Sequence, residues 1–381
     1  MTTEFSGVLE VDQRGHGFVR KLSMTLAPSN GDVYVPHSTI DRYSLRQGVV
    51  LEGIAGSPAQ NRFPSNGRRH RQRRETIRGP EVVSISLING MHVDKWSEVS
   101  EFSSRSAVSP NEKITLEGAN SDRAMRVIDL FCPLGKGQRA LIVSPPKAGK
   151  TILLQQIAQA INANYPEIEL LVLLIDERPE EVTDMKRSIR GEIFASSNDN
   201  DHASHVRLAQ IIPEYAKRKV EAGKDVVILL DSLTRLGRAF NVHQKSTGRT
   251  MSGGVDIRAL EVPKRIFGSA RKFEDGGSLT IVATILVDTN SRMDELIFQE
   301  FKGTGNMELV LDRDLANERI FPAMNLGLSG TRREELLFGD NLAAHQTLRR
   351  SISRVSPREA MSNVLNLVRQ YPTNSKLLTK F

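Results

Sequence analysis

Short apolar runs, alternating with polar residues, occupy about the first hundred residues of the chain. They cover residues 8–22, 32–40, 49–56 and 82–90, and each is bounded by Gly, Asn, Asp or Pro. This pattern is typical of β-strands separated by turns. Several short strands at close spacing favour a small barrel. We therefore predict a small all-β barrel within residues 1–110.

The pattern changes from about residue 113. The apolar runs that follow show little alternation, and helix-like segments lie between them; these runs are 140–144, 170–176, 226–231 and 279–288. Such strands belong to a mostly parallel sheet with helices on both faces. We predict an α/β domain of this kind over residues 111–381, with a polar linker around residues 99–112 before it.

One segment between the predicted strands has an unusual composition. Residues 57–80 are polar and almost free of aliphatic side chains, so they cannot bury enough apolar area to fold alone. We interpret about residues 61–80 as a mobile basic loop. Glu75 is the acidic residue opposing its arginines, which are Arg62, Arg68, Arg69, Arg71, Arg73, Arg74 and Arg78.

Composition narrows the class of protein. The chain has 381 residues and a formal net charge of +7, which permits a polyanionic partner but equally fits ordinary solubility charge. The single cysteine, Cys132, excludes an intrachain disulfide and a cysteine-clustered zinc site, and it indicates a reducing compartment. No signal peptide and no run of about eighteen apolar residues is present. We expect a cytoplasmic protein without a membrane span.

A phosphate-binding loop is predicted where the run 140–144 ends. Ser144 to Thr151 reads S-P-P-K-A-G-K-T and precedes a helical pattern. Ser144 stands where the usual pattern has Gly, and the alternative is a chance Gly-Lys-Thr. Loop N–H groups and the helix N-terminus would hold the phosphates of ATP, and the Thr151 hydroxyl would bind Mg²⁺. The expected nucleotide contacts are Lys147, Ala148, Gly149, Lys150, Thr151 and Ile152.

Acidic residues end two other apolar runs. Asp231 follows V-V-I-L-L, at an edge where a carboxylate faces the ligand crevice and could hold Mg²⁺; alternatively it caps a helix. Asp176 and Glu177 end the run from 170, where either could cap a helix, and we favour Glu177 as the base that polarises the attacking water. Arg332 and Arg333 are candidates for an arginine finger from a neighbouring subunit, although surface arginines are usually solvated.

Seven longer segments carry a specific resemblance. They are 145–151, 173–185, 229–241, 252–260, 263–284, 294–309 and 318–337. In sequence and order they resemble the bacterial Rho transcription terminators. The first hundred residues resemble them more loosely, through G-V-L-E, G-H-G-F-V-R and D-V-Y-V-P-H-S-T-I.

The resemblance implies a hexameric ring of RecA-type ATPase domains, each preceded by an OB or cold-shock-like barrel. Such rings move 5′ to 3′ on single-stranded RNA, unwind RNA–DNA and release RNA from RNA polymerase. It implies that Lys150, Glu177 and Asp231 carry hydrolysis of ATP and that Arg178 is a further site residue. It also implies three roles near subunit boundaries: Arg332 as arginine finger, Arg319 as a link to the neighbour, and Phe321 as packing for adenine.

The resemblance also implies the RNA contacts. Thr250–Leu260, preceded by Arg249, and residues 301–306 resemble the loops into the ring pore. On the barrel, Pro80 and Val82 stand where the family has a base pocket, and we suppose that the arginine-rich loop compensates by binding phosphate. Phe18 or Tyr34 could alternatively be barrel core. The expected RNA-binding residues are His16, Phe18, Arg20, Tyr34, Arg249, Lys302 and Gly303.

Two other functions fit part of these features. A RecA-type ATPase of another class, such as a rotary synthase subunit or a strand-exchange protein, would share the phosphate loop but not the N-terminal barrel. A non-catalytic RNA-binding protein would not need the hydrolytic residues Lys150, Glu177 and Asp231. ATP hydrolysis that is stimulated by RNA separates both from the Rho-like function.

Overall fold

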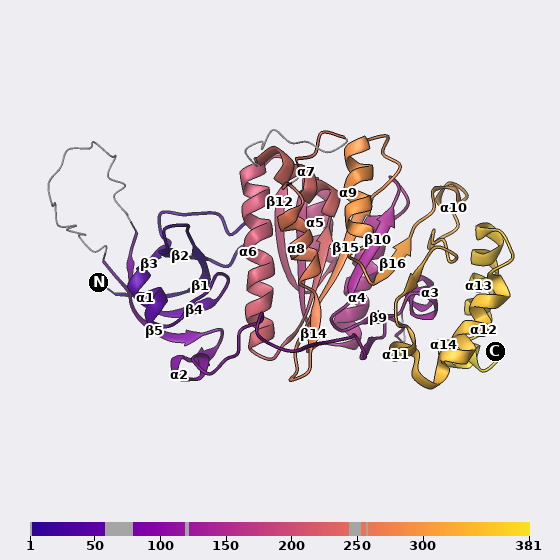
Figure 1. Ribbon diagram of the computed structural model, residues 1–381, viewed down its shortest axis with the longest axis horizontal. Coiled ribbons are helices and arrows are strands. Elements are labelled where there is room, and N and C mark those ends of the chain that lie inside the picture. Colours follow the sequence, from indigo (N-terminus) through magenta and orange to yellow (C-terminus); the bar gives the residue numbers. More distant parts are fainter. Residues whose placement is uncertain (1, 58–78, 119–121, 244–252, 257) are drawn as a thin grey trace. The chain divides into compact units, whose positions relative to one another are not determined.

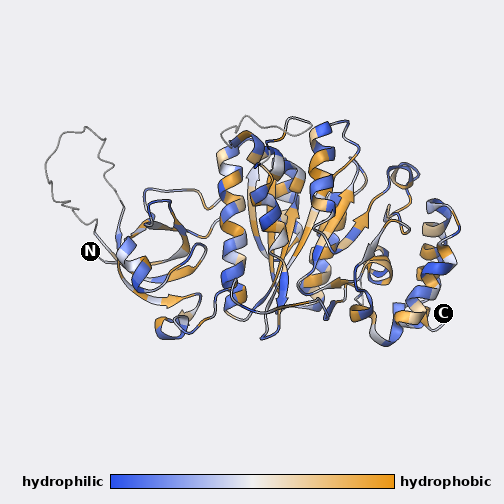
Figure 2. Cartoon of the chain, viewed as in Figure 1, coloured by the Kyte–Doolittle hydropathy of each residue, from blue (hydrophilic) through white to orange (hydrophobic). Residues whose placement is uncertain are grey.

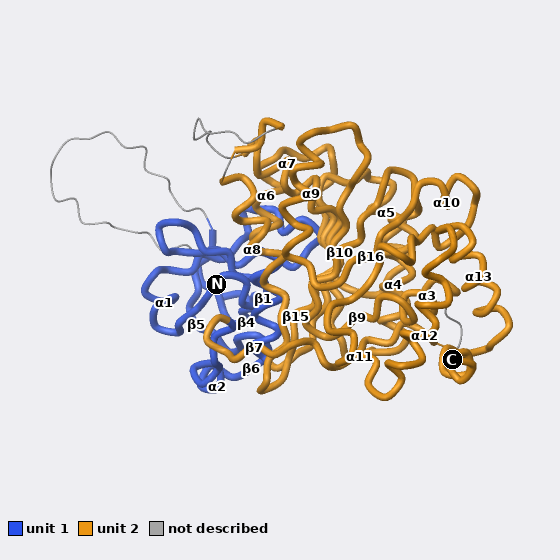
Figure 3. Tube along the Cα trace, turned by 45° about the vertical axis from the view of Figure 1, so that its right-hand side comes forward, with its two compact units in different colours: residues 1–102, 211–222 blue, residues 103–210, 223–381 orange. Residues whose placement is uncertain are grey.

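The structure is a computed structural model, and it describes residues 2–57, 79–118, 122–243, 253–256 and 258–381. The chain forms two compact units (Figure 3). The first unit contains residues 1–102 together with 211–222. The second contains residues 103–210 and 223–381. Most of the arginine-rich loop, with Arg68, Arg69, Arg71, Arg73 and Arg74, lies outside the described residues.

The first unit is built on a five-stranded barrel. Its strands are β1 (Thr3–Val11), β2 (Gly17–Arg20), β3 (Val33–Val35), β4 (Val50–Gly56) and β5 (Glu81–Ile88), followed by β6 (Met91–His92). They pair in the order β3-β2-β1-β4-β5, and a further pairing between β3 and β5 closes the sheet. Leu9, Val35, Leu51 and Ile88 are fully buried at its centre. The prediction of a small barrel is therefore confirmed.

The predicted strand over residues 32–40 is wrong in its second half. Only Val33–Val35 is strand, and helix α1 (His37–Arg42) follows directly. Pro36 lies between them and caps the helix. Because proline has no backbone N–H, it cannot extend a strand ladder but fits well at a helix start. A second short helix, α2 (Val93–Trp96), ends the barrel region.

The second unit is built on a mostly parallel sheet (Figure 1). Strands pair in the order β12-β11-β13-β15-β10-β16, all in parallel, and β17 adds to β16 in antiparallel sense. These strands are β10 (Arg139–Ser144), β11 (Glu169–Glu177), β12 (Glu192–Ser197), β13 (Asp225–Asp231), β15 (Ser278–Leu286), β16 (Met307–Val310) and β17 (Gly330–Thr331). The four predicted apolar runs are all strands of this sheet, which confirms the α/β prediction.

Four short strands join the sheet or lie beside it. Strand β14 (Arg271–Phe273) pairs with β15, and β7 (Ala107–Val108) pairs with β14. Strands β8 (Lys113–Ile114) and β9 (Leu134–Gly135) form a separate pair. Strand β7 therefore gives part of the predicted linker a regular structure.

Helices cover both faces of the sheet. Helices α4 (Lys150–Asn164) and α5 (Pro179–Ser188) contact β11 and one another, whereas α7 (Leu233–His243) contacts β15, α8 (Glu261–Gly268) and α9 (Arg292–Lys302). Along β11, Val172 and Leu174 belong to the core beneath α4, while Leu171 and Leu173 alternate with them and are equally buried. This two-sided burial explains the near-continuous apolar runs in the sequence (Figure 2).

Helices of several lengths complete the second unit. They are α3 (Arg123–Phe131), α4 (Lys150–Asn164), α5 (Pro179–Ser188), α6 (His202–Glu221), α7 (Leu233–His243), α8 (Glu261–Gly268), α9 (Arg292–Lys302), α10 (Arg313–Asn317), α11 (Glu335–Phe338), α12 (Leu342–Ile352), α13 (Pro357–Gln370) and α14 (Asn374–Leu378). The end of α6, from residue 211, belongs to the first unit. Among the described residues, no helix is both long and apolar enough to cross a bilayer.

One buried histidine makes the stability of the second unit dependent on pH. His345 stacks on Phe338 with ring centroids 3.6 Å apart, and its Nδ1 lies 3.1 Å from the Leu130 carbonyl oxygen. Burial lowers the pKa of His345 to about 4, whereas an unfolded histidine titrates near ~6.5. The unfolded chain therefore takes up the proton first, and stability is lost as pH falls through this window.

We expect His345 to account for roughly 2 kcal/mol of lost unfolding free energy between pH 7 and pH 4, after allowance for solvent screening. Urea unfolding of the wild type and of His345→Leu at both pH values measures this contribution, because leucine keeps the apolar contact but does not titrate. Equal pH dependence in the two proteins would show that His345 is not responsible.

Candidate nucleotide site and RNA-binding surface

The predicted phosphate loop joins β10 to α4. Lys147 and Gly149 have left-handed backbone conformations, with φ of 66° and 93°, and Gly149 is the N-cap of α4. Alternation of right- and left-handed residues turns successive N–H groups toward one anion. Ser144, which departs from the usual pattern, is buried and is not among the residues with positive φ, so this position does not need glycine.

Three predicted hydrolytic residues meet at the carboxyl ends of the strands. Lys150 Nζ contacts Asp231 Oδ1 and lies 3.3 Å from Glu177 Oε1. Both carboxylates are almost completely buried. Asp231 Oδ1 also accepts a hydrogen bond of 2.7 Å from the Thr284 hydroxyl, whereas Asp231 Oδ2 is buried and has no hydrogen-bond partner among the described residues. The structure therefore brings the side chains of Lys150, Glu177 and Asp231 together.

The electrostatics of this cluster suit its proposed chemistry. Burial alone would lower the pKa of Lys150, but the charges of Asp231 and Glu177 outweigh it and the pKa is raised. Burial, together with the charge of Asp231, raises the pKa of Glu177, although Lys150 and Arg235 oppose the change. A more basic Glu177 is better able to accept a hydrogen bond or proton from water.

Two contacts around this cluster were not predicted. The Thr151 hydroxyl donates to Glu181 Oε2 at 3.0 Å, and Arg235 Nη2 lies 3.3 Å from Glu177 Oε2. Glu181 lies in the E-R-P-E-E segment and Arg235 in L-L-D-S-L-T-R, so both are inside segments that carry the family resemblance. The roles of Glu181 and Arg235 could not be assigned from sequence because each contacts a residue from a different segment of the chain, which only the fold brings close.

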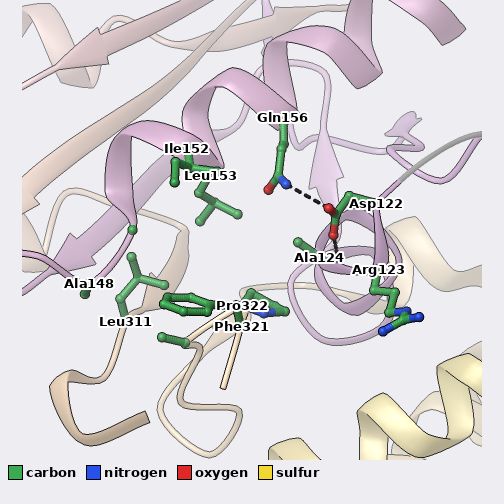
Figure 4. Close-up of a pocket in the computed structure, with 12 residues that line it drawn as sticks. Asp122, Arg123, Ala124, Ala148, Ile152, Leu153, Gln156, Leu311, Phe321 and Pro322 are labelled. Carbon is green, nitrogen blue, oxygen red and sulfur yellow. Dashed lines mark hydrogen bonds between the residues drawn. The ribbon is translucent and has the colours of Figure 1, made fainter. Parts of the chain in front are cut away.

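A cavity of about 570 Å³ adjoins the loop. Figure 4 shows Phe321 on one side of it and Ile152 and Gln156 of α4 on the other. The Phe321 side chain is 48% exposed, which leaves its ring free to pack on a base. Gln156 Nε2 donates to Asp122 Oδ2 at 3.0 Å along the cavity wall. An apolar platform beside a phosphate loop is suited to a purine nucleotide.

The predicted arginines lie around the site rather than within it. Arg178 is exposed at the N-cap of α5. The predicted lysine Lys147 is likewise exposed, in the phosphate loop. Arg319 is exposed on the turn before Phe321 and has φ of 60°. Arg332 is exposed at a second cavity, of about 490 Å³, which Arg349 also lines. Within the described residues, Arg332 is not a lining residue of the cavity at Phe321.

The barrel carries a cluster of rings on its surface. The His16, Phe18 and Tyr34 centroids lie 5.5–5.8 Å apart. All three residues are half-buried and none belongs to the barrel core, so Phe18 and Tyr34 are not core residues. Arg20 lies beside Phe18, and both Glu10 and Asp32 contact its guanidinium at 2.5 Å. Clustered rings beside fixed donors and acceptors suit stacked, unpaired bases.

Pro80 and Val82, which the resemblance sets at a second base pocket, both contact the barrel itself. The Pro80 carbonyl accepts a hydrogen bond of 2.8 Å from the Tyr34 N–H. Val82 pairs with Ala55 and packs against the barrel core. A side chain that faces the core cannot contact a base, so Val82 does not replace an aromatic residue in base binding.

The predicted pore segments are only partly described. Arg249 lies outside the described residues, while Lys302 and Gly303 are exposed at the end of α9. Gly253 lies so close to the Arg292 backbone that a Cβ would come within 3.0 Å of the Arg292 carbonyl oxygen. The turn 287–292 is thus adjacent to Gly253 and lines a cavity of about 410 Å³. Sequence reasoning missed this turn; its signal was the polar T-N-S after an apolar strand.

Comparison with known proteins identifies the family. The model "Rho termination factor, RNA-binding domain" matches residues 5–94, and "ATP synthase alpha/beta family, nucleotide-binding domain" matches residues 124–331. Transcription termination factor Rho of Borreliella burgdorferi is 48% identical over 98% of the chain and 70% of its own length. The chain belongs to the Rho transcription termination factor family. Rho of Pseudomonas aeruginosa is 47% identical over 97% of this chain and 86% of its own.

Solved structures agree with the Rho-family fold. A type III secretion ATPase has a TM-score of 0.56 at 22% identity, covering 65% of this chain and 69% of its own. The ATP synthase subunit NeqB of Nanoarchaeum equitans also has a TM-score of 0.56, at 19% identity, covering 70% of this chain and 71% of its own. These likenesses concern the fold alone. The predicted family and fold class, a barrel followed by a RecA-type ATPase domain, are confirmed.

Proposed function

We propose that this Rho-family chain is an RNA-dependent ATPase that moves along single-stranded RNA and terminates transcription, acting as a ring of six copies on RNA polymerase. The observation that carries the proposal is the meeting of Lys150, Glu177 and Asp231 beside a phosphate loop, in a chain that also presents His16, Phe18 and Tyr34 on an RNA-binding barrel. The buried thiol of Cys132 fits a reducing compartment, so we place the protein in the cytoplasm.

The geometry supports in-line attack on the γ-phosphate of ATP. Loop N–H groups between Lys147 and Thr151 would hold the phosphates, and Lys150 would reach the β- and γ-oxygens. Glu177 Oε2, held by Arg235, would orient the attacking water. Phe321 would pack on adenine above the cavity floor, with Ala148 and Ile152 completing the contact.

The residues present also fit a magnesium ion. Within the part of the chain that the structure describes, Asp231 Oδ2 is buried with no hydrogen-bond partner, and the Thr151 hydroxyl lies at the helix start beside the phosphate loop. Oxygen donors suit Mg²⁺, which is usually held by one or two carboxylates together with substrate phosphates and waters. When bound, the ion would neutralise charge on the phosphates. We therefore propose Thr151 and Asp231 as the residues that hold it.

The exposed arginines fit roles that need a second subunit. Arg332 is exposed and borders a cavity other than the nucleotide cavity, so we propose that it completes the site of a neighbouring copy as an arginine finger. Arg178 and Arg319 are exposed beside the site and would meet the other neighbour, the one that supplies its Arg332 to this site. A homohexameric ring provides one such neighbour at every site.

RNA would bind at two places. On the barrel, His16, Phe18 and Tyr34 would stack on bases beside the guanidinium of Arg20. In the ring, Arg249, Lys302 and Gly303 would contact the threaded strand. Because Gly253 packs on the Arg292 backbone, we add Arg292 to this second set.

The function is tested by ATP hydrolysis with and without RNA. We expect pyrimidine-rich single-stranded RNA to stimulate hydrolysis strongly and duplex DNA to have little effect, with a hexamer mass under the same conditions. Full hydrolysis by unassembled chains without RNA would contradict the proposal.

We expect Phe18→Ala and Tyr34→Ala each to weaken binding of single-stranded RNA by roughly 10- to 100-fold, because a base loses one stacking surface worth ~1–3 kcal/mol. Fluorescence anisotropy of a labelled oligonucleotide measures the change. Val83→Ala is the matched control, since Val83 is 64% exposed on the same barrel and is not one of the three clustered side-chain rings. Unchanged affinity in both aromatic variants would exclude this face as an RNA site.

A further inference from the structure

A line of polar contacts lies behind the proposed base Glu177. It begins at Ser196 on β12, whose hydroxyl lies 2.7 Å from Nδ1 of His205 on α6. On the other side of the ring, His205 Nε2 lies 3.9 Å from Asp176 Oδ1 at the end of β11. Ser196 and His205 are 3% and 2% exposed, so neither side chain has ready access to water.

The line continues to the reacting end of the site through Arg235. Asp176 Oδ2 lies 3.8 Å from Arg235 Nη1, and Arg235 Nη2 lies 3.3 Å from Glu177 Oε2. The guanidinium of Arg235 therefore interacts with the carboxylates of both Asp176 and Glu177. Any movement of Asp176 changes how Arg235 is shared between Asp176 and Glu177.

Local backbone geometry makes this sharing possible. Neighbouring side chains on a regular strand point to opposite faces. In β11, however, Ile175 pairs with Ser196 and Glu177 with Ser197, so Asp176 is an extra residue at an irregularity in the register. Its φ is 56°. Such a bulge redirects side chains next to functional sites, and here it brings Asp176 and Glu177 to the same arginine.

The surroundings of His205 favour a neutral ring and decide which of its nitrogens carries the proton. Burial lowers the pKa of His205, and the positive charges of His202 and Arg235 act in the same direction, against Asp176 and Asp201. The neutral ring has one N–H. If the Ser196 hydroxyl donates to Nδ1, the N–H lies on Nε2 and faces the Asp176 carboxylate. At 3.9 Å this is an attraction between the N–H dipole and the carboxylate charge rather than a hydrogen bond. The other tautomer would set a lone pair against that charge.

We propose that His205 is a positioning residue for ATP hydrolysis, which holds Asp176 in place so that Arg235 keeps Glu177 oriented toward the attacking water. The proposal rests on the ATPase function proposed above. Among the described residues, His205 contacts neither Lys150 nor Glu177, so its effect on the reaction passes through Asp176 and Arg235.

The two ring nitrogens can be tested separately. His205→Gln can place an amide N–H near the Nε2 position, toward Asp176, whereas His205→Asn reaches only the Nδ1 position, toward Ser196. We expect His205→Asn to lower kcat of RNA-stimulated hydrolysis about tenfold or more, because small misplacements of a catalytic group are costly. The KM for ATP should stay within about twofold, and His205→Gln should keep most of the kcat.

The pH dependence of kcat separates a positioning role from a merely structural one, because loss of packing alone would not shift the pH at which kcat falls. Without the His205 contact, Asp176 is expected to draw Arg235 away from Glu177. Because Arg235 opposes the rise of the Glu177 pKa, the acidic limb of kcat in His205→Asn should then move to higher pH, and it should stay in place in His205→Gln. Unfolding by urea, measured on both variants, separates loss of stability from loss of positioning.

The outcomes are distinguishable. Equal losses of kcat in the two variants, in proportion to their loss of stability, would overturn the proposal and leave His205 as a packing residue. If either variant fails to fold, Asp176→Asn replaces it, since Asp176 is half-exposed; a normal kcat in Asp176→Asn would overturn the proposal equally. Wild-type protein that lacks RNA-stimulated hydrolysis would refute the proposed function instead.

Discussion

Replacing Glu177 with glutamine is expected to lower kcat for RNA-stimulated ATP hydrolysis by roughly a thousandfold, while ATP and RNA still bind. The amide keeps the size of the buried side chain but cannot accept a proton. It also keeps an oxygen that can face Arg235 or Lys150, so the fold should persist. Steady-state hydrolysis and equilibrium binding of a fluorescent ATP analogue measure the two properties separately.

The matched control for this change is Glu181→Gln. Glu181 lies on α5 and accepts a hydrogen bond from Thr151, but unlike Glu177 it is not buried against Asp231 and Lys150. We expect its replacement to alter nucleotide affinity more than kcat. Multiple turnovers at the normal rate in Glu177→Gln would mean that another group orients the water.

Removing the guanidinium of Arg332 is the second change with a large expected effect. Arg332→Ala should lower kcat by about 10³-fold or more, which is the range for the loss of an arginine finger. Binding of nucleotide to isolated chains should change little, because Arg332 does not line the cavity at Phe321. Arg333→Ala is the control; Arg333 is also exposed and contacts Glu335 and Ser109 on its own chain.

Mixing the two inactive variants tests whether Arg332 acts across a boundary. In a ring assembled from Arg332→Ala and Glu177→Gln chains, some boundaries combine an intact Glu177 with an intact Arg332 from the neighbour. Hydrolysis should then return in part, with a yield that depends on the mixing ratio. No recovery at any ratio, in rings of confirmed mixed composition, would place Arg332 in the site of its own chain.

Much of the fold could be predicted because burial leaves a direct trace in the sequence. The strands β10, β11, β13 and β15 are covered on both faces, so their apolar runs were unambiguous. Strand β12, E-I-F-A-S-S, was missed because four of its six residues are polar or small. The end of the run 32–40 was wrong because Pro36 starts a helix.

The site could be predicted only where one segment carries the chemistry. Lys150 and Thr151 follow from the loop pattern, and Glu177 and Asp231 from acids that end apolar strands. Arg235 and His205 gave no such signal, because each acts through a partner on another strand or helix, and only the folded chain sets Asp176 beside them. A register irregularity of one residue in β11 decides these contacts, and sequence pattern does not reveal it.

The ammonium group of Lys150 is the counter-ion of two buried acids in this conformation of the site. A triphosphate that attracts this ammonium leaves Asp231 without its counter-ion and Glu177 with Arg235 as its remaining cation, a costly state for buried carboxylates unless another cation takes the place of Lys150. Nucleotide and divalent metal are therefore expected to enter as a pair. By reciprocity, each must strengthen binding of the other by the same factor.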